Sequence, residues 1–309
     1  MATPMISSQW PRFVLPIIRK EWTQRLQEVT SPLAQFYGID TSSVAQEYSQ
    51  GVGTLGLVPE YNSASAAGAP ASIEYDNFNP LYETTFTHKE FALGIAIERK
   101  LWDDERTGQI KRKAQTLGFS FGTTVANHMS SVLRNAFSSS FLGGDSKALC
   151  ATDHPANTVG SSAAWSNKGT TALSYDAVVA TLQAGKRMKD DRGNPYPVLY
   201  NTLYVPTELE ATAYEIVNAL GKPGTADNDA NFVGGQGLQT IVDPYLTDVN
   251  DWFMISSGMA SMHLLWFWRV RPEIALDPGS DYNLVAKYRG YMRYSFGWDD
   301  ARWIYGHEV

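Results

Sequence analysis

A helical pattern between residues 103 and 140 constrains this chain more than any other feature. Apolar residues recur there every three or four positions, the spacing of one buried helix face. They are Ile110, Ala114, Leu117, Phe121, Val125, Met129, Val132, Ala136 and Phe137. The three acids at positions 103–105 favour the N-terminus of this helix through its dipole. Gly118 and Gly122 lower the helix propensity, which predicts close packing against another backbone, and His128 beside the stripe is expected to be a satisfied histidine.

A long strand is predicted just before that helix, because side chains alternate between two faces over residues 82–102. One face holds Thr85, Thr87, Lys89, Phe91, Leu93, Ile95 and Ile97. Residues 71–78, with Asn79 and Pro80 at the turn, are expected to pair with it as a long ribbon. A lone ribbon is at best marginally stable in water, so this one is expected to lie on another surface.

The first 57 residues mix weak helical pieces with breakers. Trp22, Leu26 and Val29 have helical spacing after Pro16, and residues 51–72 are rich in Gly, Ala and Ser. These features predict an extended arm with anchors rather than a compact unit.

Gly51, Gly53 and Gly56 match the dinucleotide fingerprint G-x-G-x-x-G. That motif binds a pyrophosphate only where a helix follows the glycines, and Pro59 opposes a helix here. A flexible linker is the better interpretation.

Residues 174–218 predict a helix, a buried strand ending at Pro206 and a second helix. Val178, Leu182 and Met188 form one face, and Ser174 is expected to cap the first helix. Thr207 is expected to cap the second helix, with Glu208 and Glu210 in its first turn. We interpret the two glutamates as helix-start residues rather than as a catalytic pair.

The C-terminal segment predicts two or three antiparallel strands with one apolar face. That face holds Leu264, Trp266, Trp268 and Val270, then Tyr288, Met292, Tyr294, Phe296 and Trp298. Arg269 and Arg271 lie opposite, where a solvated or inter-subunit face is favoured over phosphate contacts.

The segment Leu-Cys-Ala-Thr-Asp-His-Pro at 149–155 holds the only cysteine, Cys150, with Asp153 and His154 close behind. A cysteine nucleophile or half a metal site would use these residue types. The other histidines, His88, His128, His263 and His307, form no paired motif with it. Because Asp153 can bond to nearby backbone and Pro155 stops extension, a turn is favoured and the cysteine hydrolase stays an alternative.

Asp227, Asp229 and Asn231 imitate the start of a calcium loop. The template then requires Gly at Phe232 and Glu at Leu238, so it fails twice. No metal, cofactor or catalytic residue is predicted anywhere in the chain.

The composition allows a substantial core, since 43% of the 309 residues are hydrophobic and 18% are charged. A net charge of -7 argues against a surface built to grip nucleic acid. No apolar run approaches the length of a membrane span, and the N-terminus lacks a signal-peptide pattern. One cysteine cannot form an internal disulfide, which fits a reducing compartment.

The order of these elements resembles the major capsid proteins of tailed bacteriophages, with the Hong Kong ninety-seven capsid fold. Local strings are similar as well, particularly to Mu-like major head subunits: LCATDHP, NTLYVPTELEATA, VDPYLTDVNDWF and YRGYMRYSFGWDDARWIYG. The resemblance implies an α+β fold with an N-terminal arm, an E-loop ribbon, a spine helix in a peripheral domain, and an α/β axial domain. The domains would be residues 1–58 (arm), 59–99 (E-loop), 100–172 (peripheral), 173–267 (axial) and 268–309 (C-terminal strands returning to the peripheral domain).

The resemblance also implies a structural role, not an enzyme. The chain would self-assemble as pentamers and hexamers into an icosahedral shell around double-stranded DNA, made in the host bacterial cytoplasm and kept in the virion. Implied partners are separate scaffolding and portal proteins, with cement proteins as a further class. Contact with packaged DNA would be weak and non-specific, and no membrane is implied.

Two departures from relatives are expected. No N-terminal scaffolding helix is visible, so scaffolding would be separate or already removed. Lys89 lies on the ribbon, but no crosslink partner can be named, and no crosslink is predicted. An encapsulin-type compartment shares the fold and stays an alternative.

Overall fold

The structure is a computed structural model. It describes residues 10–58, 60, 73, 75–77, 80–104, 108–156, 164–219, 221, 230–277 and 284–309. The chain divides into two compact units. Unit 1 comprises Met1–Glu47, Phe86–Val132 and Leu265–Gly297, and unit 2 comprises Tyr48–Thr85, Leu133–Leu264 and Trp298–Val309.

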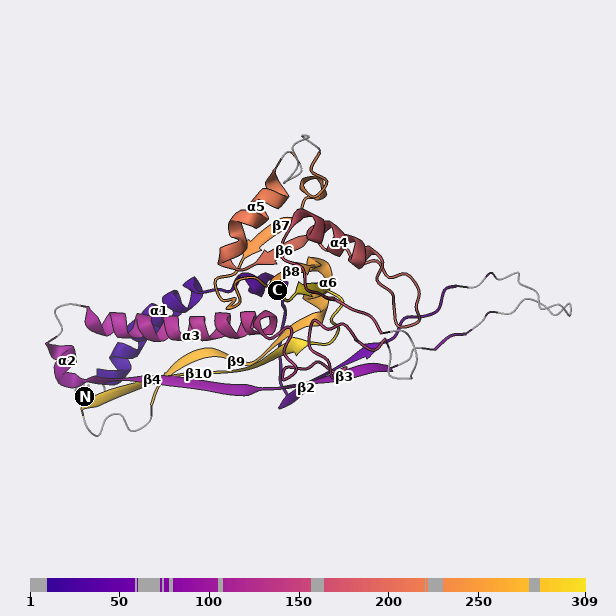
Figure 1. The fold of residues 1–309 in the computed structure, drawn as a ribbon. Coiled ribbons are helices and arrows are strands. Elements are labelled where there is room, and N and C mark those ends of the chain that lie inside the picture. Colours follow the sequence, from indigo (N-terminus) through magenta and orange to yellow (C-terminus); the bar gives the residue numbers. More distant parts are fainter. Residues whose placement is uncertain are drawn as a thin grey trace. The chain divides into compact units, whose positions relative to one another are not determined.

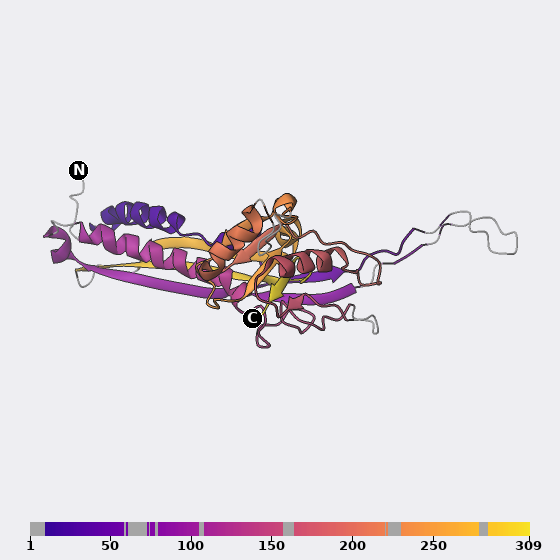
Figure 2. The same cartoon turned by 45° about the horizontal axis from the view of Figure 1, so that its top comes forward.

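Unit 1 combines two long helices with a four-stranded sheet in the order β1-β9-β10-β4. The helices are α1 (Trp10–Glu28) and α3 (Gln109–Arg134), with the short η2 (Pro32–Phe36) and α2 (Arg99–Asp103). The strands are β1 (Gly38–Thr41), β4 (Lys89–Glu98), β9 (Leu264–Leu276) and β10 (Val285–Trp298). β1 is parallel to β9, and β10 is antiparallel to β4. Figures 1 and 2 both show α1 lying beside α3.

The contact between α1 and α3 is close, as the glycines of α3 predicted. A Cβ atom at Gly118 would clash with the carbonyl oxygen of Trp22, and one at Gly122 would lie 2.8 Å from the Cβ of Val29. The ring of Trp22 meets Phe121 of α3 edge-on at 5.9 Å. Small residues on α3 therefore let the two backbones approach.

The expectation that the first 57 residues form no compact unit is wrong for residues up to Tyr37. Ile18 and Leu33 are fully buried, and Pro16 lies within α1 rather than before it. Tyr37 Oη donates to the carbonyl oxygen of Met129 at 2.9 Å. The N-terminal helix is thus part of the core of unit 1, because its apolar face finds a partner in α3 that the local sequence does not show.

Helix α3 begins later than the acids predicted. Asp103 ends α2, Asp104 is the C-cap of α2, and position 105 lies outside the described residues. The apolar stripe itself is confirmed: Ile110, Ala114, Leu117, Phe121, Met129 and Val132 are buried. Ala136 and Phe137 lie beyond the end of the helix.

The long strand is confirmed as β3 (Pro80–Thr87) and β4, separated only by His88, but its expected partner is wrong. β3 pairs with β2 (Gln46–Val52), and β4 pairs with β10. Within residues 71–78, Ile73 and residues 75–77 are not in a strand, and the others lie outside the described residues. β2 is polar and half exposed, so it lacks the alternating apolar pattern of a strand.

Unit 2 is built on a five-stranded sheet in the order β5-β11-β8-β6-β7. The strands are β5 (Lys168–Gly169), β6 (Thr202–Val205), β7 (Gln239–Val242), β8 (Trp252–Ile255) and β11 (Ile304–His307). Its helices are α4 (Tyr175–Lys186), α5 (Glu210–Asn218) and α6 (Ser257–His263), with η3 (Thr207–Leu209) and η4 (Gly234–Gln236). One core cluster joins α4, α5, β6 and β8.

The helix, strand and helix predicted for 174–218 are present, with one capping error. Ser174 Oγ accepts from the backbone N–H of Ala177 at 3.2 Å, so this cap is confirmed. Thr207 instead opens η3, and Leu209, which makes no side-chain cap bond, precedes α5.

The expected set of C-terminal strands divides between the two sheets. Trp266, Trp268, Tyr288 and Tyr294 are buried on β9 and β10, as their alternation predicted. β11 instead joins the sheet of unit 2, antiparallel to β8. In the described part of the chain, no helix has the length and apolar character needed to cross a membrane.

Candidate functional site

The Cys150 segment is held in unit 2 by backbone hydrogen bonds to two neighbouring stretches, at Ala136 and at residues 165–167. The N–H of Cys150 donates to the carbonyl oxygen of Ala136 at 2.8 Å. His154 and Trp165 exchange two backbone bonds, at 3.0 and 2.9 Å. The N–H of Asn167 then donates to Ala151 O at 3.1 Å, so the segment is fixed on both sides.

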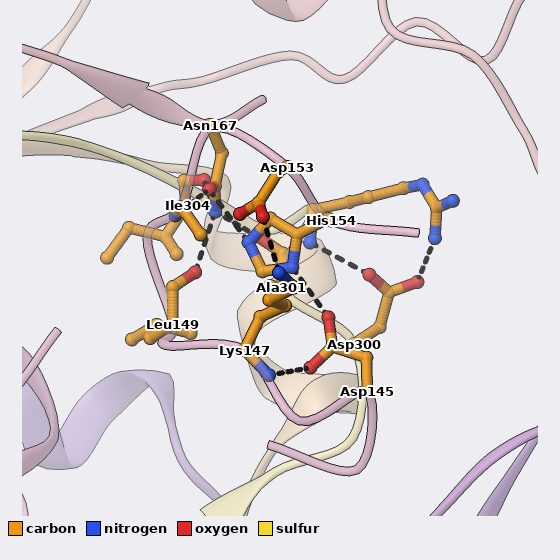
Figure 3. Close-up of polar contacts among 11 residues, drawn as sticks. Asp145, Lys147, Leu149, Asp153, His154, Asn167, Asp300, Ala301 and Ile304 are labelled. Carbon is orange, nitrogen blue, oxygen red and sulfur yellow. Dashed lines mark hydrogen bonds and ion pairs between the residues drawn. The ribbon is translucent and has the colours of Figure 1, made fainter. Parts of the chain in front are cut away.

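Asn167 lies at the centre of a buried polar cluster, which Figure 3 shows. Its Nδ2 lies 2.8 Å from the carbonyl oxygen of Leu149, 3.0 Å from that of Ala301 and 3.2 Å from that of Ile304. Its Oδ1 accepts from the N–H of Ala151 at 2.9 Å. The Asn167 side chain thereby joins the Cys150 segment to the chain at the start of β11. Sequence reasoning missed Asn167, since an isolated asparagine carries no signal of burial.

His154 is fully buried and has a partner at each ring nitrogen. Nδ1 lies 2.6 Å from Asp145 Oδ2, and Nε2 lies 3.1 Å from Asn167 Oδ1. Because Nδ2 of Asn167 faces carbonyl oxygens, Oδ1 must face His154 and act as acceptor. Each ring nitrogen of His154 therefore faces an acceptor oxygen, Nδ1 that of Asp145 and Nε2 that of Asn167.

With both ring nitrogens engaged by Asp145 and Asn167, neither is placed to act as the base of a nucleophile. Its ring also stacks on Trp165, with centroids 4.4 Å apart. Asp153 does not bond forward as expected but pairs with Lys147, which lowers the pKa of the Asp153 carboxyl.

Cys150 is equally unsuited to nucleophilic chemistry. Its side chain is 1% exposed, and burial raises the pKa of the thiol far above its usual value. A Cβ atom at Gly306 would lie 2.7 Å from Sγ, which shows how tightly the thiol is packed. A thiolate is the reactive form, so the cysteine hydrolase alternative is wrong on this geometry.

The remaining histidines each lie in a separate polar or aromatic setting. His88 lies between the hydroxyls of Ser42 and Ser295, at 2.9 and 3.0 Å, and burial lowers its pKa. His128 contacts the hydroxyl of Tyr294, as a satisfied histidine should.

In unit 2, His263 Nδ1 lies 2.8 Å from Asp299 Oδ1. Burial alone would lower the pKa of His263, but Asp299 and Asp300 outweigh it and raise the pKa. His307 Nε2 lies 2.9 Å from Thr181 Oγ1, and the ring stacks on Trp252. Among the described residues, no three potential ligands are grouped as a metal site would require.

The other candidate motifs carry no chemistry either. Glu208 and Glu210 are exposed on the surface. Asn231 fixes its loop by donating to the carbonyl oxygens of Ile216 and Ala219, while positions 227 and 229 lie outside the described residues. Arg269 donates to the carbonyl oxygen of Ser42 at 3.2 Å.

The glycines of the dinucleotide-like motif also lack the required structure. β2 ends at Val52, and the chain stays irregular from Gly53 to Val58, so no helix follows to meet a phosphate.

An exposed apolar stretch is the strongest functional feature of unit 2. It lies on β2 and on the described residues between β2 and β3, namely 53–58, 60, 73 and 75–77. We call the segment 53–79 the β2–β3 loop. Val58 is 95% exposed, Tyr75 90% and Leu57 77%. Tyr48, Val52, Leu55 and Ile73 are exposed as well. Several exposed apolar residues gathered in one segment mark a protein interaction surface.

Comparison with known proteins decides the family. A family model described as phage capsid protein matches residues 82–306, well over half of the chain. This chain belongs to the phage capsid protein family. It is a major capsid subunit and therefore a structural protein rather than an enzyme, and its place is the virion capsid.

Solved structures from phages share the fold of this capsid protein at low sequence identity. A chain from Mycobacterium phage Patience is 8% identical, with 99% of this chain and 88% of that chain covered and a TM-score of 0.57. A chain from Microbacterium phage Oxtober96 is 11% identical, with 90% of each chain covered and a TM-score of 0.55. The procapsid of bacteriophage JBD30 gives 13% identity, 98% and 76% coverage and a TM-score of 0.53. No curated protein matches the sequence.

Proposed function

We propose that this capsid protein closes into an icosahedral head shell, as pentamers and hexamers around the double-stranded DNA of a tailed phage. The exposed apolar side chains of β2 and the β2–β3 loop carry this proposal. Covering such side chains with another surface lowers the free energy of the system, and in a shell a neighbouring copy provides that surface. The similar JBD30 structure is a procapsid, which supports this assembly.

The expected interface is of the obligate class, on the order of 2,000 Å² or more per pair of subunits. At roughly 25 cal/mol per Å² of apolar area, part of that burial offsets the entropy lost on association. A contact between one loop and a different patch on the neighbour is heterologous, and such contacts can close into rings.

The domain roles implied by the resemblance complete the proposal. Residues 1–58 would be the arm, 59–99 the E-loop, 100–172 the peripheral domain with α3 as its spine helix, and 173–267 the axial domain. Residues 268–309 would be the C-terminal strands. The long β3–β4 strand and the 26-residue helix α3 support the E-loop and spine-helix assignments.

The proposed partners are separate scaffolding and portal proteins, with cement proteins as a further class. Assembly would take place in the host bacterial cytoplasm, and packaged DNA would be contacted weakly. The strings at residues 149–155 and 288–306 support a likeness to Mu-like head subunits.

Sedimentation and electron microscopy of the purified chain, with and without its scaffold, test the proposal. We expect monomers or rings alone and closed shells with scaffold. A stable dimer or tetramer that never forms rings with scaffold would overturn it. Shells that enclose protein cargo instead of DNA would support the encapsulin alternative.

A further inference from the structure

The turn at residues 189–195, just after α4, is closed by hydrogen bonds to one carboxylate. Asp190 Oδ1 accepts from the backbone N–H of Arg192 at 2.9 Å and from that of Asn194 at 2.7 Å. Gly193 has a φ of +87°, a conformation that favours glycine. Lys189 and Pro195 form an isolated bridge that closes the turn.

The same turn holds the start of the β2–β3 loop at Thr54. The Thr54 N–H donates to Asp191 Oδ1 at 3.0 Å, and its hydroxyl lies 2.9 Å from Asp190 Oδ2 and 2.5 Å from Asp191 Oδ1. Asp191 is buried. Burial alone would raise the pKa of Asp190, but its hydrogen bonds outweigh burial and lower the pKa, so this acceptor stays ionised at neutral pH.

The turn also holds the returning chain of the loop. Arg192 Nη1 lies 2.7 Å from Asp76 Oδ2, and Nη2 lies 3.1 Å from both Asp76 Oδ1 and the carbonyl oxygen of Asn77. Asp76 Oδ2 in turn accepts from the N–H of Gly56 at 2.8 Å. The two chains of the loop are therefore joined to each other and to the turn. Figure 1 shows the chain after α4 reaching the chain that leaves β2.

We infer that the 189–195 turn is a clasp that fixes the direction in which the β2–β3 loop leaves unit 2 to dock on a neighbouring copy. This inference rests on the proposed function. The exposed residues Leu55, Leu57 and Tyr75 lie within three residues of the held positions. Holding both chains at the base reduces the conformational freedom that docking would otherwise have to remove, which raises affinity without a new contact.

Hydrogen exchange of the unassembled chain tests the clasp directly. Asp191→Ala removes the acceptor of the Thr54 N–H, and we expect exchange in peptides covering residues 52–58 to rise about tenfold. Asp191→Asn keeps an acceptor oxygen and should stay close to the parent. Thr54→Val removes the hydroxyl contacts to the turn but none of the bonds within it, and it should free the loop partly. Lys147→Ala breaks the ion pair to Asp153, away from the loop, and is the matched control.

Shell assembly in the presence of scaffold is the second measurement that tests the clasp. For Thr54→Val combined with Arg192→Ala, we expect the threshold concentration for shells to rise about tenfold, with an unchanged circular dichroism spectrum. Unchanged exchange and an unchanged threshold in these variants would overturn the clasp while leaving the capsid function intact. If the parent itself never forms shells, the proposed function fails, and the exchange result still decides whether the turn holds the loop.

Discussion

The two compact units of this capsid protein differ in charge and in how they hold themselves together. Unit 1 carries 16 Lys and Arg against 12 Asp and Glu, a net +4, whereas unit 2 carries 9 against 20, a net -11. The overall charge of -7 therefore hides two regions of opposite sign. Charges that are scattered along the sequence are sorted by the fold.

Their cohesion differs as well. In unit 1 the apolar faces of α1, α3 and the sheet meet one another, with Trp22 on Phe121 and Trp266 stacked on Tyr294. Unit 2 has its own apolar core but also depends on the buried polar cluster around Asn167. We therefore expect the stability of unit 1 to fall most when a buried side chain is made smaller. The stability of unit 2 should fall most when a buried hydrogen bond is removed.

The largest effect is expected at the contact between α1 and α3. Trp22→Ala should lower the free energy of unfolding of unit 1 by about 4 kcal/mol, because it removes a large buried side chain. Hydrogen exchange in urea, read from peptides of α1 and α3 against those of β6 and α5, locates the loss. Ile17→Ala, on the exposed side of α1, is the control. If Trp22→Ala leaves α3 protected, α1 is a detachable arm after all.

The next effect belongs to unit 2. Asn167→Ala should cost about 3 kcal/mol, since it leaves buried carbonyl oxygens and the N–H of His154 without their partner. Exposed Ser166 is the neighbouring control, and Ser166→Ala should change stability little. Equal stability of the two variants, measured by urea unfolding, would show that the polar cluster does not hold unit 2 together.

Acid should weaken unit 2 through His307. Burial lowers its pKa to about 4, below the value of about 6.5 expected in the unfolded chain. Between these values the unfolded state binds the additional proton, so stability is full above pH 6.5 and falls as the pH drops towards 4. The loss of stability reaches about 3 kcal/mol near pH 4. His307→Phe keeps a ring against Trp252 and should flatten this part of the stability curve relative to the parent. If the stability of His307→Phe and that of the parent depend on pH in the same way, the loss in acid does not come from His307.

A smaller effect is expected at Cys150. Cys150→Ser should cost about 1 kcal/mol by placing a hydroxyl in a packed site, and particle formation should persist. The parent thiol should react slowly with thiol probes while folded. Rapid selective labelling, or loss of assembly with intact subunits, would mean that the thiol has a role beyond packing.

The smallest effect concerns DNA, and it tests whether the positive charge of unit 1 forms a binding surface. We expect binding to bulk duplex DNA no tighter than about 1 µM at physiological salt. Filter binding across a salt series measures this. Tight binding with a steep salt dependence would show that unit 1 grips DNA.

Several elements of this fold follow from local patterns alone. The sequence alone predicts the apolar stripe of α3 and the alternation of β9 and β10, because periodicity reveals which face is covered. It also predicts the cap at Ser174 and, because glycine has no side chain, the close approach at Gly118. The absence of a catalytic role for Cys150 was favoured by the same reasoning.

Other features were decided only by tertiary structure. β2 was missed because a polar, half-exposed strand is recognised by its partner β3 rather than by its own residues. β11 follows β10 in the sequence but belongs to the other sheet, where it pairs with β8. This pairing depends on where β8 lies in the folded chain. Asn167, His154 and Asp145 are brought together from turns, and Thr54 meets Asp191 across 137 positions of sequence. Local sequence encodes which face of an element is apolar, whereas partners distant in sequence are fixed only when the whole chain packs.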